Sequence, residues 1–451
     1  MSSVFHRIPK RSLPIAVKGD GMYIFDKDGR RYIDGYAGGA CVSCLGHSQE
    51  SVIEAVREQI GKMAFFHSSV FTSEPLEELA AILTTDAPEG LSRVFFTNSG
   101  SEAVETAVMM ARQYFVEIGQ SSRKKVIGRR ASYHGAGLTG LGVGYTVSRR
   151  APFEEVLPNV FHISPCYEYR GRLDDETAEQ YGLRAANELE QAILGLGPDT
   201  VMAFVAETVT GTANGSTPPT PGYFNRVREI CDQYGVLLVL DEVLCGLGRT
   251  GTLHACEQDG VAPDFLTFAK GIAAGYQPIG ATMVNQKIYE AIVSGSGTFK
   301  GGYTYSGHAT ACAAAVAVQR VIRAPGFLDH IKAAGNVLAA RLNDRFAQHP
   351  HIGDIRGRGM LMTVELVEHR DTKSPFAASQ DLSSKINQNA EARGLITSAF
   401  SGTIDGYVGD HVVICPPLIA TGANIDTIVG LLGEAIDAAV LDVRSEGAHV
   451  S

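Results

Sequence analysis

The sequence contains no apolar run long enough to cross a membrane and no long run of lysine or arginine residues. The alanine-rich piece at residues 311–318 falls well short of the roughly 20 residues that a membrane-spanning helix needs. The net charge is −10, so neither nucleic acid nor an anionic membrane surface is an expected partner. The first residues, MSSVFHRIPKRSLP, lack the apolar core of an export signal. We therefore expect a cytoplasmic protein that binds neither a membrane nor nucleic acid.

Paired metal-binding motifs are also absent. Of the eight cysteines, only Cys41 and Cys44 form a CxxC, and no second pair or histidine cluster follows at zinc spacing. We expect buried free thiols and no metal site. With 451 residues, of which 45% are hydrophobic and 20% charged, the chain can bury a large core, and its length favours two domains.

Two apolar segments each end at one charged side chain. Residues 236–240 form an aliphatic run typical of a parallel strand buried on both faces, and the run stops at Asp241. Residues 265–269 stop in the same way at Lys270. Ligands of open α/β sheets bind outside the carboxyl ends of the strands, so both side chains could face one molecule. Pyridoxal phosphate (PLP) requires this pair, because its aldehyde forms a Schiff base with a lysine and its pyridinium nitrogen needs a carboxylate. The alternative is that both residues merely cap buried strands.

A further strand, residues 93–97, leads directly into a helix that starts near Ser101. Gly100 lets the backbone approach a ligand, and Ser99 and Ser101 offer hydroxyl and N–H groups. The start of a helix also carries partial positive charge, so this segment predicts a cradle for an anion. The alternative is an ordinary N-cap, because serine is among the commonest residues there.

Other strand ends carry polar or aromatic residues. Residues 124–128 lead to Tyr133, which could stack on a flat cofactor or simply pack in a loop, and the next buried strand ends at Glu207. A Gly-x-Gly-x-x-Gly pattern at residues 246–251 matches a dinucleotide fingerprint. However, residues 241–243 separate it from its strand and no long helix follows, so we do not expect a nicotinamide cofactor.

The order of these patterns predicts an α/β protein with a large and a small domain. Residues 1–50 form an N-terminal arm that joins the small domain, with a β-hairpin around Asp28. Residues 51–325 alternate strand and helix patterns, which predicts a large doubly wound domain. Residues 326–451 begin with an amphipathic helix and continue with a strand at residues 357–366, which predicts a smaller α+β domain.

Five motifs occur in this chain: NSGSEAVETA at 98–107, SYHG at 132–135, DEVLCGLGRTG at 241–251, FAKG at 268–271 and GYTYSGH at 302–308. With them the chain resembles the class III aminotransferases, the ω-transaminase branch of the fold-type-I PLP enzymes, over nearly its whole length. The resemblance implies the fold of that group, PLP as the cofactor, and a homodimer or tetramer with shared active sites.

The resemblance also implies individual roles. Lys270 would hold the cofactor aldehyde and, once freed, move a proton between the substrate carbon and the cofactor, while Asp241 would hold the pyridinium proton. Val243 would pack under the ring and Tyr133 over its other face, with His134 beside it in the cofactor site. The other implied cofactor contacts are Ser99, Gly100 and Ser101 at the phosphate, Thr304 at the phosphate of the neighbouring subunit, and Glu207 near the ring oxygen and the substrate.

Three departures from the family pattern concern the substrate. Many ω-transaminases carry a mobile arginine that takes a substrate carboxylate, but residues 398–413 contain no arginine and Gly406 occupies that place. A carboxylate must then be bound by an arginine elsewhere or by backbone N–H groups. Residues 38–41 read GGAC where aromatic-amine transaminases often have a tryptophan, and this chain has none, so we expect a more open or less aromatic pocket. The usual Glu-Pro is here Glu207-Thr208.

The predicted function is transfer of an amino group from an ω-amino acid, diamine or related amine to a 2-oxo acid such as pyruvate or 2-oxoglutarate, by a ping-pong mechanism. An aminomutase or amino-acid racemase of the same family uses the same cofactor, and the motifs hardly separate these activities. A third hypothesis is a PLP-binding protein without catalysis. The presence of both Lys270 and Asp241, and the absence of an attached DNA-binding segment, argue against it.

Overall fold

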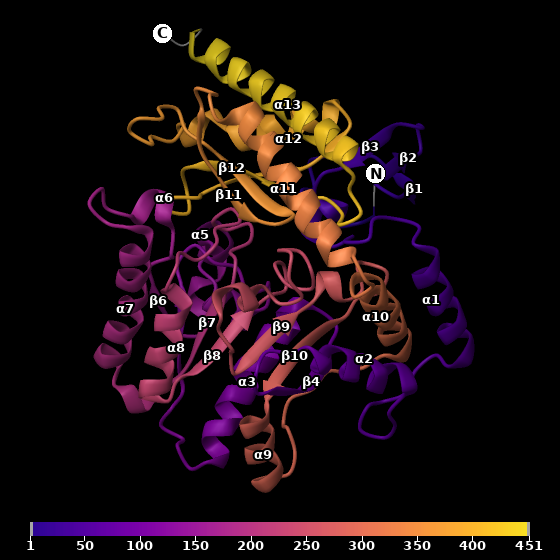
Figure 1. The fold of residues 1–451 in the computed structure, drawn as a ribbon, viewed down its shortest axis with the longest axis vertical. Coiled ribbons are helices and arrows are strands. Elements are labelled where there is room, and N and C mark those ends of the chain that lie inside the picture. The colour runs from indigo at the N-terminus through magenta and orange to yellow at the C-terminus, as the bar shows by residue number, and fades with distance from the viewer. Residues whose placement is uncertain (1–2, 449–451) are drawn as a thin grey trace.

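A computed structural model describes residues 3–448 and divides them into two lobes, one above the other in Figure 1. The larger lobe is built on a seven-stranded sheet and the smaller lobe on two four-stranded sheets. The smaller lobe contains both the N-terminal strands and the C-terminal helix (Figure 1). This arrangement is the mixed α/β fold that the sequence predicts.

The seven-stranded sheet is parallel except for one strand. In spatial order it consists of β4 (Leu91–Thr97), β10 (Gly280–Asn285), β9 (Phe265–Phe268), β8 (Leu237–Asp241), β7 (Val201–Glu207), β5 (Lys125–Arg129) and β6 (Phe161–Ile163). Strand β10 runs antiparallel to both of its neighbours. All residues of β7, β8 and β9 are buried, as expected for central strands covered on both faces.

Alternate side chains of the central strands enter two separate cores. Leu237 and Val239 belong to a cluster with helices α3 (Gly100–Glu117) and α9 (Gln286–Ser294), whereas Leu238 and Leu240 belong to a larger cluster on the other face. Successive side chains of a strand point to opposite faces, so a continuous aliphatic run supplies both cores. The helices of the larger lobe that contribute to the larger cluster include α1 (Glu50–Lys62), α2 (Glu74–Thr85), α7 (Ala178–Leu196), α8 (Tyr223–Tyr234) and α10 (Ala309–Ile322).

The N-terminal arm is a small sheet attached to the smaller lobe. Strands β1 (Ala16–Asp20), β2 (Tyr23–Asp26) and β3 (Arg31–Asp34) form an antiparallel meander, and β3 pairs in parallel with β13 (Leu395–Ile396). The predicted hairpin around Asp28 is confirmed as β2 and β3. The sequence pattern around Asp28 does not distinguish β1 from β2 as a strand of its own.

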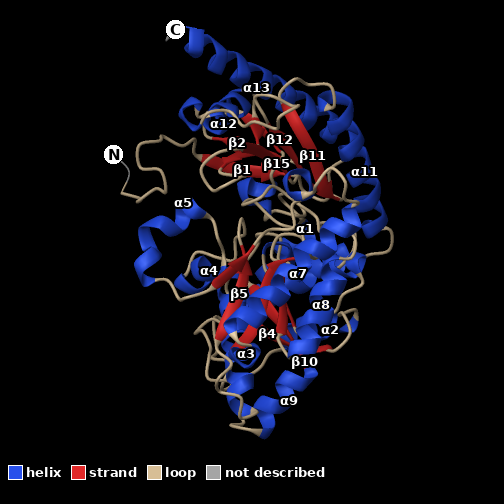
Figure 2. Cartoon of the chain, turned by 90° about the vertical axis from the view of Figure 1, so that its left-hand side faces the viewer, coloured by secondary structure: helices blue, strands red, loops and turns tan. Residues whose placement is uncertain are grey.

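The second sheet of the smaller lobe is antiparallel, in the order β11 (Ile352–Arg358), β12 (Leu361–Leu366), β15 (Asp410–Ile414) and β14 (Ser398–Ser401). Helices α11 (Phe327–Phe346), α12 (Leu382–Ala392) and α13 (Gly422–Ala448) accompany it (Figure 2). The prediction of one strand across residues 357–366 is wrong. The chain reverses at Gly359, whose positive φ of 56° favours glycine, so these residues belong to a hairpin of β11 and β12.

Short helical segments complete the fold. The short α-helices are α4 (Leu138–Val143), α5 (Val147–Arg150) and α6 (Glu168–Gly171). Single turns of 3₁₀ or π type are η1 (Ala37–Cys41), η2 (Ala151–Val156), η3 (Pro198–Thr200), η4 (Ala255–Asp259), η5 (Lys270–Ile272) and η6 (Ala378–Gln380). All eight cysteines are free and buried, which confirms the prediction of buried thiols.

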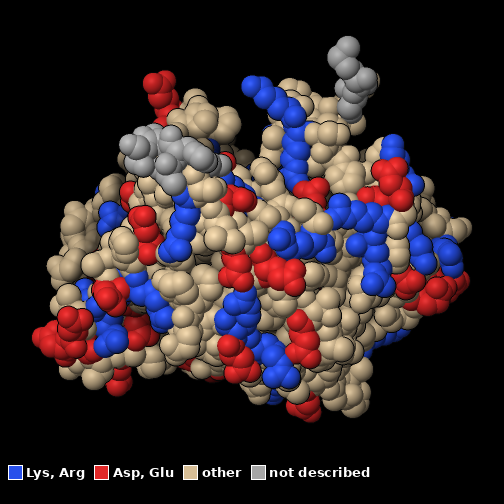
Figure 3. All heavy atoms as spheres, turned by 90° about the horizontal axis from the view of Figure 1, so that it is seen from above, with Lys and Arg blue, Asp and Glu red and all other residues tan. Residues whose placement is uncertain are grey.

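Charged side chains of both signs are interspersed on the face of the smaller lobe that Figure 3 shows. Within residues 3–448, no three His, Cys, Asp or Glu side chains are grouped as they would be around a metal ion. In the same part of the chain no single helix is long and apolar enough to span a membrane. The bent pair α10 and α11 meets that requirement by length and composition only.

The glycine-rich segment 246–251 forms turns and no helix follows it directly, so it lacks the geometry of a dinucleotide site. Instead it joins the lobes. The buried Arg249 guanidinium donates to the carbonyl oxygens of Met360 and Pro416 in the smaller lobe, at 3.1 and 2.5 Å.

Glu242, next to this segment, is expected to make stability depend on pH. Its carboxylate accepts hydrogen bonds from the N–H groups of Ala255 and Cys256 and from the Thr208 hydroxyl, at 2.7 to 3.0 Å. Burial nevertheless raises the pKa of Glu242 to about 7, from an ordinary value of 4.5. Below pH 4.5, the ordinary pKa, the Glu242 carboxyl is protonated in both the folded and the unfolded chain, so its contribution to the stability of the fold is fully present there. The contribution is lost as the pH rises through about 7, because the unfolded chain releases the proton first.

The matched variant is Glu242→Gln, which does not titrate. The difference in melting temperature, wild type minus variant, should decrease as the pH rises from about 5 to about 8. The decrease should correspond to at most about 3 kcal/mol in the free energy of unfolding. A difference that stays constant over this range would contradict a raised pKa at Glu242.

Candidate active site

The carboxyl ends of the parallel strands and the loops after them border one cavity of about 370 Å³. Asp241 ends β8, Glu207 ends β7, and Lys270 lies two residues beyond β9. The opposite wall comes from the smaller lobe and the N-terminal arm, with Phe400 of β14 and Gly39 among its residues. The cavity therefore lies outside the carboxyl edge of the sheet, where open α/β sheets bind ligands.

Asp241 is held in place by three neighbours. Its Oδ2 lies 2.8 Å from the Nδ1 of His134, and its Oδ1 accepts the N–H of Val243 at 2.9 Å and the Thr267 hydroxyl at 3.4 Å. Both Asp241 and His134 are buried, and the other ring nitrogen of His134 has no hydrogen-bond partner within the described chain. A carboxylate fixed in this way can meet a ligand with little rearrangement.

Lys270 presents a primary amine to the same cavity. It is half-buried, and within residues 3–448 its Nζ has no hydrogen bond or ion pair. Its φ of +44° lies in the left-handed region, which is unfavourable for a residue with a side chain. Such backbone strain clusters at functional sites, where the surrounding structure enforces it.

The predicted anion cradle is at the start of α3. Ser99 caps this helix by accepting the N–H of Glu102 at 3.2 Å, and the Ser101 hydroxyl accepts the N–H of Ala136 at the same distance. A Cβ atom at Gly100 would come within 2.7 Å of Val243, so only glycine fits there. The helix is therefore capped by Ser99 and not, as the N-cap alternative supposed, by Ser101. The same helix start borders the cavity through Gly100 and Ser101.

Glu207 is a buried carboxylate whose side chain has no ion pair with a lysine or arginine among residues 3–448. Its Oε1 accepts the N–H of Tyr133 at 3.1 Å and its Oε2 accepts the N–H of Gly211 at 2.6 Å. Burial raises the pKa of Glu207 above its ordinary value. Arg129 donates to the carbonyl oxygen of Glu207, not to its carboxylate.

The structure brings most of the predicted site residues to this one cavity. Those that line it are Gly100, Ser101, Tyr133, His134, Glu207, Asp241, Val243 and Lys270. Ser99 lies one residue behind, as the N-cap of α3. Thr304 is exposed and does not border the cavity of its own chain.

The arm and β14 supply wall residues that the motifs did not identify. Tyr36 and Phe400 lie with their ring centroids 6.2 Å apart, edge to face. Gly38 and Gly39 have φ values near +75° and +79° and add no side chain to the wall. The expectation of a more open or less aromatic pocket from the GGAC segment stays a prediction. The guanidinium of Arg149 also borders the cavity, and nothing in the sequence distinguishes it from the neighbouring Arg150.

These residues fit PLP. The unpaired amine of Lys270, the fixed carboxylate of Asp241 and the helix start at Gly100 match its aldehyde, ring nitrogen and phosphate respectively. Because Gly100 has no Cβ atom, Val243 can pack directly against the start of α3.

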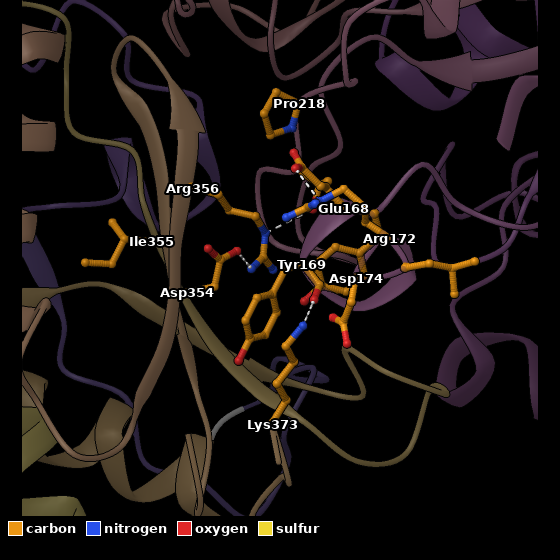
Figure 4. Close-up of a pocket in the computed structure, with 12 residues that line it drawn as sticks. Glu168, Tyr169, Arg172, Asp174, Pro218, Asp354, Ile355, Arg356 and Lys373 are labelled. Atoms are coloured by element: carbon orange, nitrogen blue, oxygen red, sulfur yellow. Dashed lines mark hydrogen bonds and ion pairs between the residues drawn. The ribbon is translucent and has the colours of Figure 1, made fainter. Parts of the chain in front are cut away.

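A second hollow, of about 400 Å³, lies where the two lobes meet and has a different character (Figure 4). Several of its charged side chains have partners within the protein. The Arg356 guanidinium lies 2.8 Å from an oxygen of Asp354, and the Lys373 amine donates to the carbonyl oxygen of Tyr169 at 2.6 Å. Behind them, buried Glu365 bridges Arg356 and Arg170. The contacts of Glu365 with Arg170 and of Lys373 with Tyr169 join the two lobes.

Known proteins that are similar to this chain in sequence or structure are aminotransferases. The family model "Aminotransferase class-III" matches residues 7–436. An uncharacterized aminotransferase of Schizosaccharomyces pombe is 41% identical over 97% of this chain and 95% of its own length. A putrescine–pyruvate aminotransferase of Pseudomonas aeruginosa is 34% identical over 96% of this chain and 92% of its own. The crystal structure of an omega transaminase from Pseudomonas jessenii in complex with PMP has a TM-score of 0.90 and 34% identity, and the match covers 96% of this chain and 94% of that one.

Proposed function

Because this chain belongs to the class-III aminotransferases, which use PLP, we propose that it transfers an amino group from an ω-amino acid, diamine or related amine to a 2-oxo acid. The observation that carries the proposal is the shared cavity of Lys270, Asp241 and the start of α3. The similarity to a putrescine–pyruvate aminotransferase supports a diamine donor and pyruvate as the acceptor.

Each residue of the cavity then has a distinct task. Bound PLP supplies an electron sink for the reaction at the substrate carbon. The Nζ of Lys270 accepts the proton that leaves the substrate carbon and later returns a proton, as general base and acid. Asp241 holds the proton of a bound ring nitrogen, and His134 orients Asp241. Gly100 and Ser101 offer N–H groups to a phosphate, and Tyr133 and Val243 hold the two faces of a planar ring.

The direct test is a screen of half-reactions. The purified protein should be yellow and should lose that absorbance when it receives a suitable amine, with release of one carbonyl product per site. A 2-oxo acid should then restore the colour. An aminomutase or racemase would release no carbonyl product in stoichiometric amount. A protein whose absorbance is indifferent to a broad panel of diamines, ω-amino acids and 2-oxo acids would not be an aminotransferase.

We also propose that two copies of this chain form a dimer with shared active sites. Thr304 and Tyr305 are exposed, and Tyr305 stacks edge to face with exposed Phe65, 5.4 Å between ring centroids. Val70 and Phe71, in the same connection after α1, are more than 60% exposed. Neighbouring exposed apolar side chains of this kind are typical of interfaces.

Mixed dimers test the shared site. A dimer of one Lys270→Ala subunit and one Thr304→Ala subunit should contain one site with both Lys270 and an intact Thr304 from the partner. Such hybrids should therefore bind PLP more tightly than the Thr304→Ala homodimer. Light scattering of the wild type should give twice the chain mass. A monomer at micromolar concentration would contradict the dimer. The cytoplasmic location stays a prediction that cell fractionation can check.

A further inference from the structure

Arg149 is a charged residue at the cavity wall to which the proposed mechanism gives no task. It belongs to the short helix α5, is half-buried, and lines the cavity with Tyr133 and Lys270. The carbon of its guanidinium lies 4.8 Å from the centroid of the Tyr133 ring, a cation–π contact that orients the group. Within residues 3–448, no hydrogen bond or ion pair involves this guanidinium, although an arginine has five N–H groups to donate.

The acids around it already have partners. The carboxylate of Glu207 accepts two backbone N–H groups, and that of Asp241 is held by His134, Val243 and Thr267. Asp405, which borders the adjacent hollow, accepts the N–H groups of its own turn at 2.8 and 2.9 Å. A free carboxylate that enters the cavity therefore has little competition for Arg149.

The other arginines nearby are occupied or exposed. Arg150 donates to three carbonyl oxygens of residues 141–144 and to Glu154. Arg130 is exposed and donates to the Ser164 hydroxyl at 3.0 Å. Arg7 also borders the cavity, but it lies on an exposed N-terminal segment outside any helix or strand. Arg149 thus combines access to the cavity with a defined orientation.

The packing of α5 explains why residue 406 carries no arginine. Gly406 has a φ of +92°, and a Cβ atom there would overlap the side chain of Val147. Gly406, Val147 and Arg149 all border a hollow of about 360 Å³ that adjoins the cofactor cavity and shares Arg149, Thr212 and Phe400 with it. Helix α5 therefore excludes a side chain at 406 and, two residues later, supplies a guanidinium to the same region.

We propose that Arg149 binds the carboxylate of the 2-oxo acid acceptor. Its planar fork of donors matches a carboxylate in a two-point geometry, and the Tyr133 ring below it reduces the freedom lost on binding. This inference rests on the proposed aminotransferase function and names the residue that selects carboxylate-bearing substrates.

Equilibrium binding tests the inference independently of turnover. The probes are propionate, which has the carboxylate of pyruvate but no carbonyl group to react, and its uncharged analogue propionamide. By calorimetry on the holoenzyme, propionate should bind more tightly than propionamide. Arg149→Gln should weaken propionate binding roughly 10- to 100-fold, the size of a lost charged hydrogen-bonded pair, and should leave propionamide unchanged. Arg149→Lys should lie between the two, because lysine keeps the charge but loses the fork.

The matched control is Arg130→Gln, which removes the same charge from the wall of the adjacent hollow and should change propionate affinity less than about threefold. Kinetics give a second readout. Arg149→Gln should raise the KM for pyruvate far more than it lowers kcat. Equal propionate affinity in wild type and Arg149→Gln, or an equal loss in Arg130→Gln, would overturn the inference. If no amine bleaches the wild type, the proposed function fails, whereas the propionate titration still decides the role of Arg149.

Discussion

Replacing Lys270 with alanine is expected to abolish amino transfer, with a fall in kcat of at least about 10³-fold, the contribution of a positioned general acid and base. The structure leaves no substitute, because no other lysine borders the cavity of the described chain. The neighbouring titratable groups, Asp241, His134 and Glu207, are already engaged in hydrogen bonds. Steady-state transfer from the best donor of the half-reaction screen measures the loss. Borohydride reduction should attach the cofactor covalently to the wild type and not to the variant.

Three controls separate loss of the amine from loss of the fold. Without cofactor, the variant should melt close to the wild type, since the Nζ of Lys270 has no partner in residues 3–448. Small primary amines added to the buffer should restore part of the rate in proportion to their concentration, because they replace the missing base. The exposed Lys332→Ala should retain full activity. If Lys270→Ala transfers amino groups at the wild-type rate without added amine, catalysis by PLP at this lysine is contradicted.

Most strands of the large sheet could be predicted because their side chains carry a direct signal. The run at residues 237–240 is aliphatic throughout, since alternate residues enter the two cores on opposite faces of the sheet. Strand β10 escaped prediction because its sequence, GATMVN, begins with small and polar residues. Its Thr282 is buried only because the hydroxyl donates to the carbonyl oxygen of Ala103 in α3. The antiparallel direction of β10 depends on tertiary contacts that no local pattern records.

The cofactor site was more predictable than the substrate site for a physical reason. Asp241 ends a strand, and Lys270 and Gly100 lie two and three residues beyond one, so the strand pattern fixes where they lie. Arg149 belongs to a pair of adjacent arginines, and only the fold determines that Arg150 turns inward to three carbonyl oxygens while Arg149 faces the cavity. Phe400 likewise reaches the site from the smaller lobe, 130 residues beyond Lys270.

The second large effect is expected from Asp241→Asn, which should keep the fold and the cavity but lower kcat by roughly 10²- to 10³-fold, as for loss of one preorganised electrostatic contact. The amide oxygen can still accept the N–H of Val243, which places the NH₂ group where Oδ2 now faces His134. That geometry is nearly isosteric with the aspartate. What disappears is the negative charge, and a neutral amide cannot hold the proton of a pyridinium nitrogen, so the electron sink weakens.

Two measurements distinguish this cause from a general disturbance of the site. Reconstitution of Asp241→Asn with an N-methylated PLP, whose ring is positively charged without a bound proton, should recover part of the lost rate, whereas the wild type should gain nothing from it. Asp241→Glu keeps the charge but lengthens the side chain, so it should lose activity without being rescued by the methylated cofactor. A kcat for Asp241→Asn within a few-fold of the wild type would mean that the ring is not protonated in this cavity. The hydrogen bonds from His134 and Val243 would then serve only to hold the end of β8 in place.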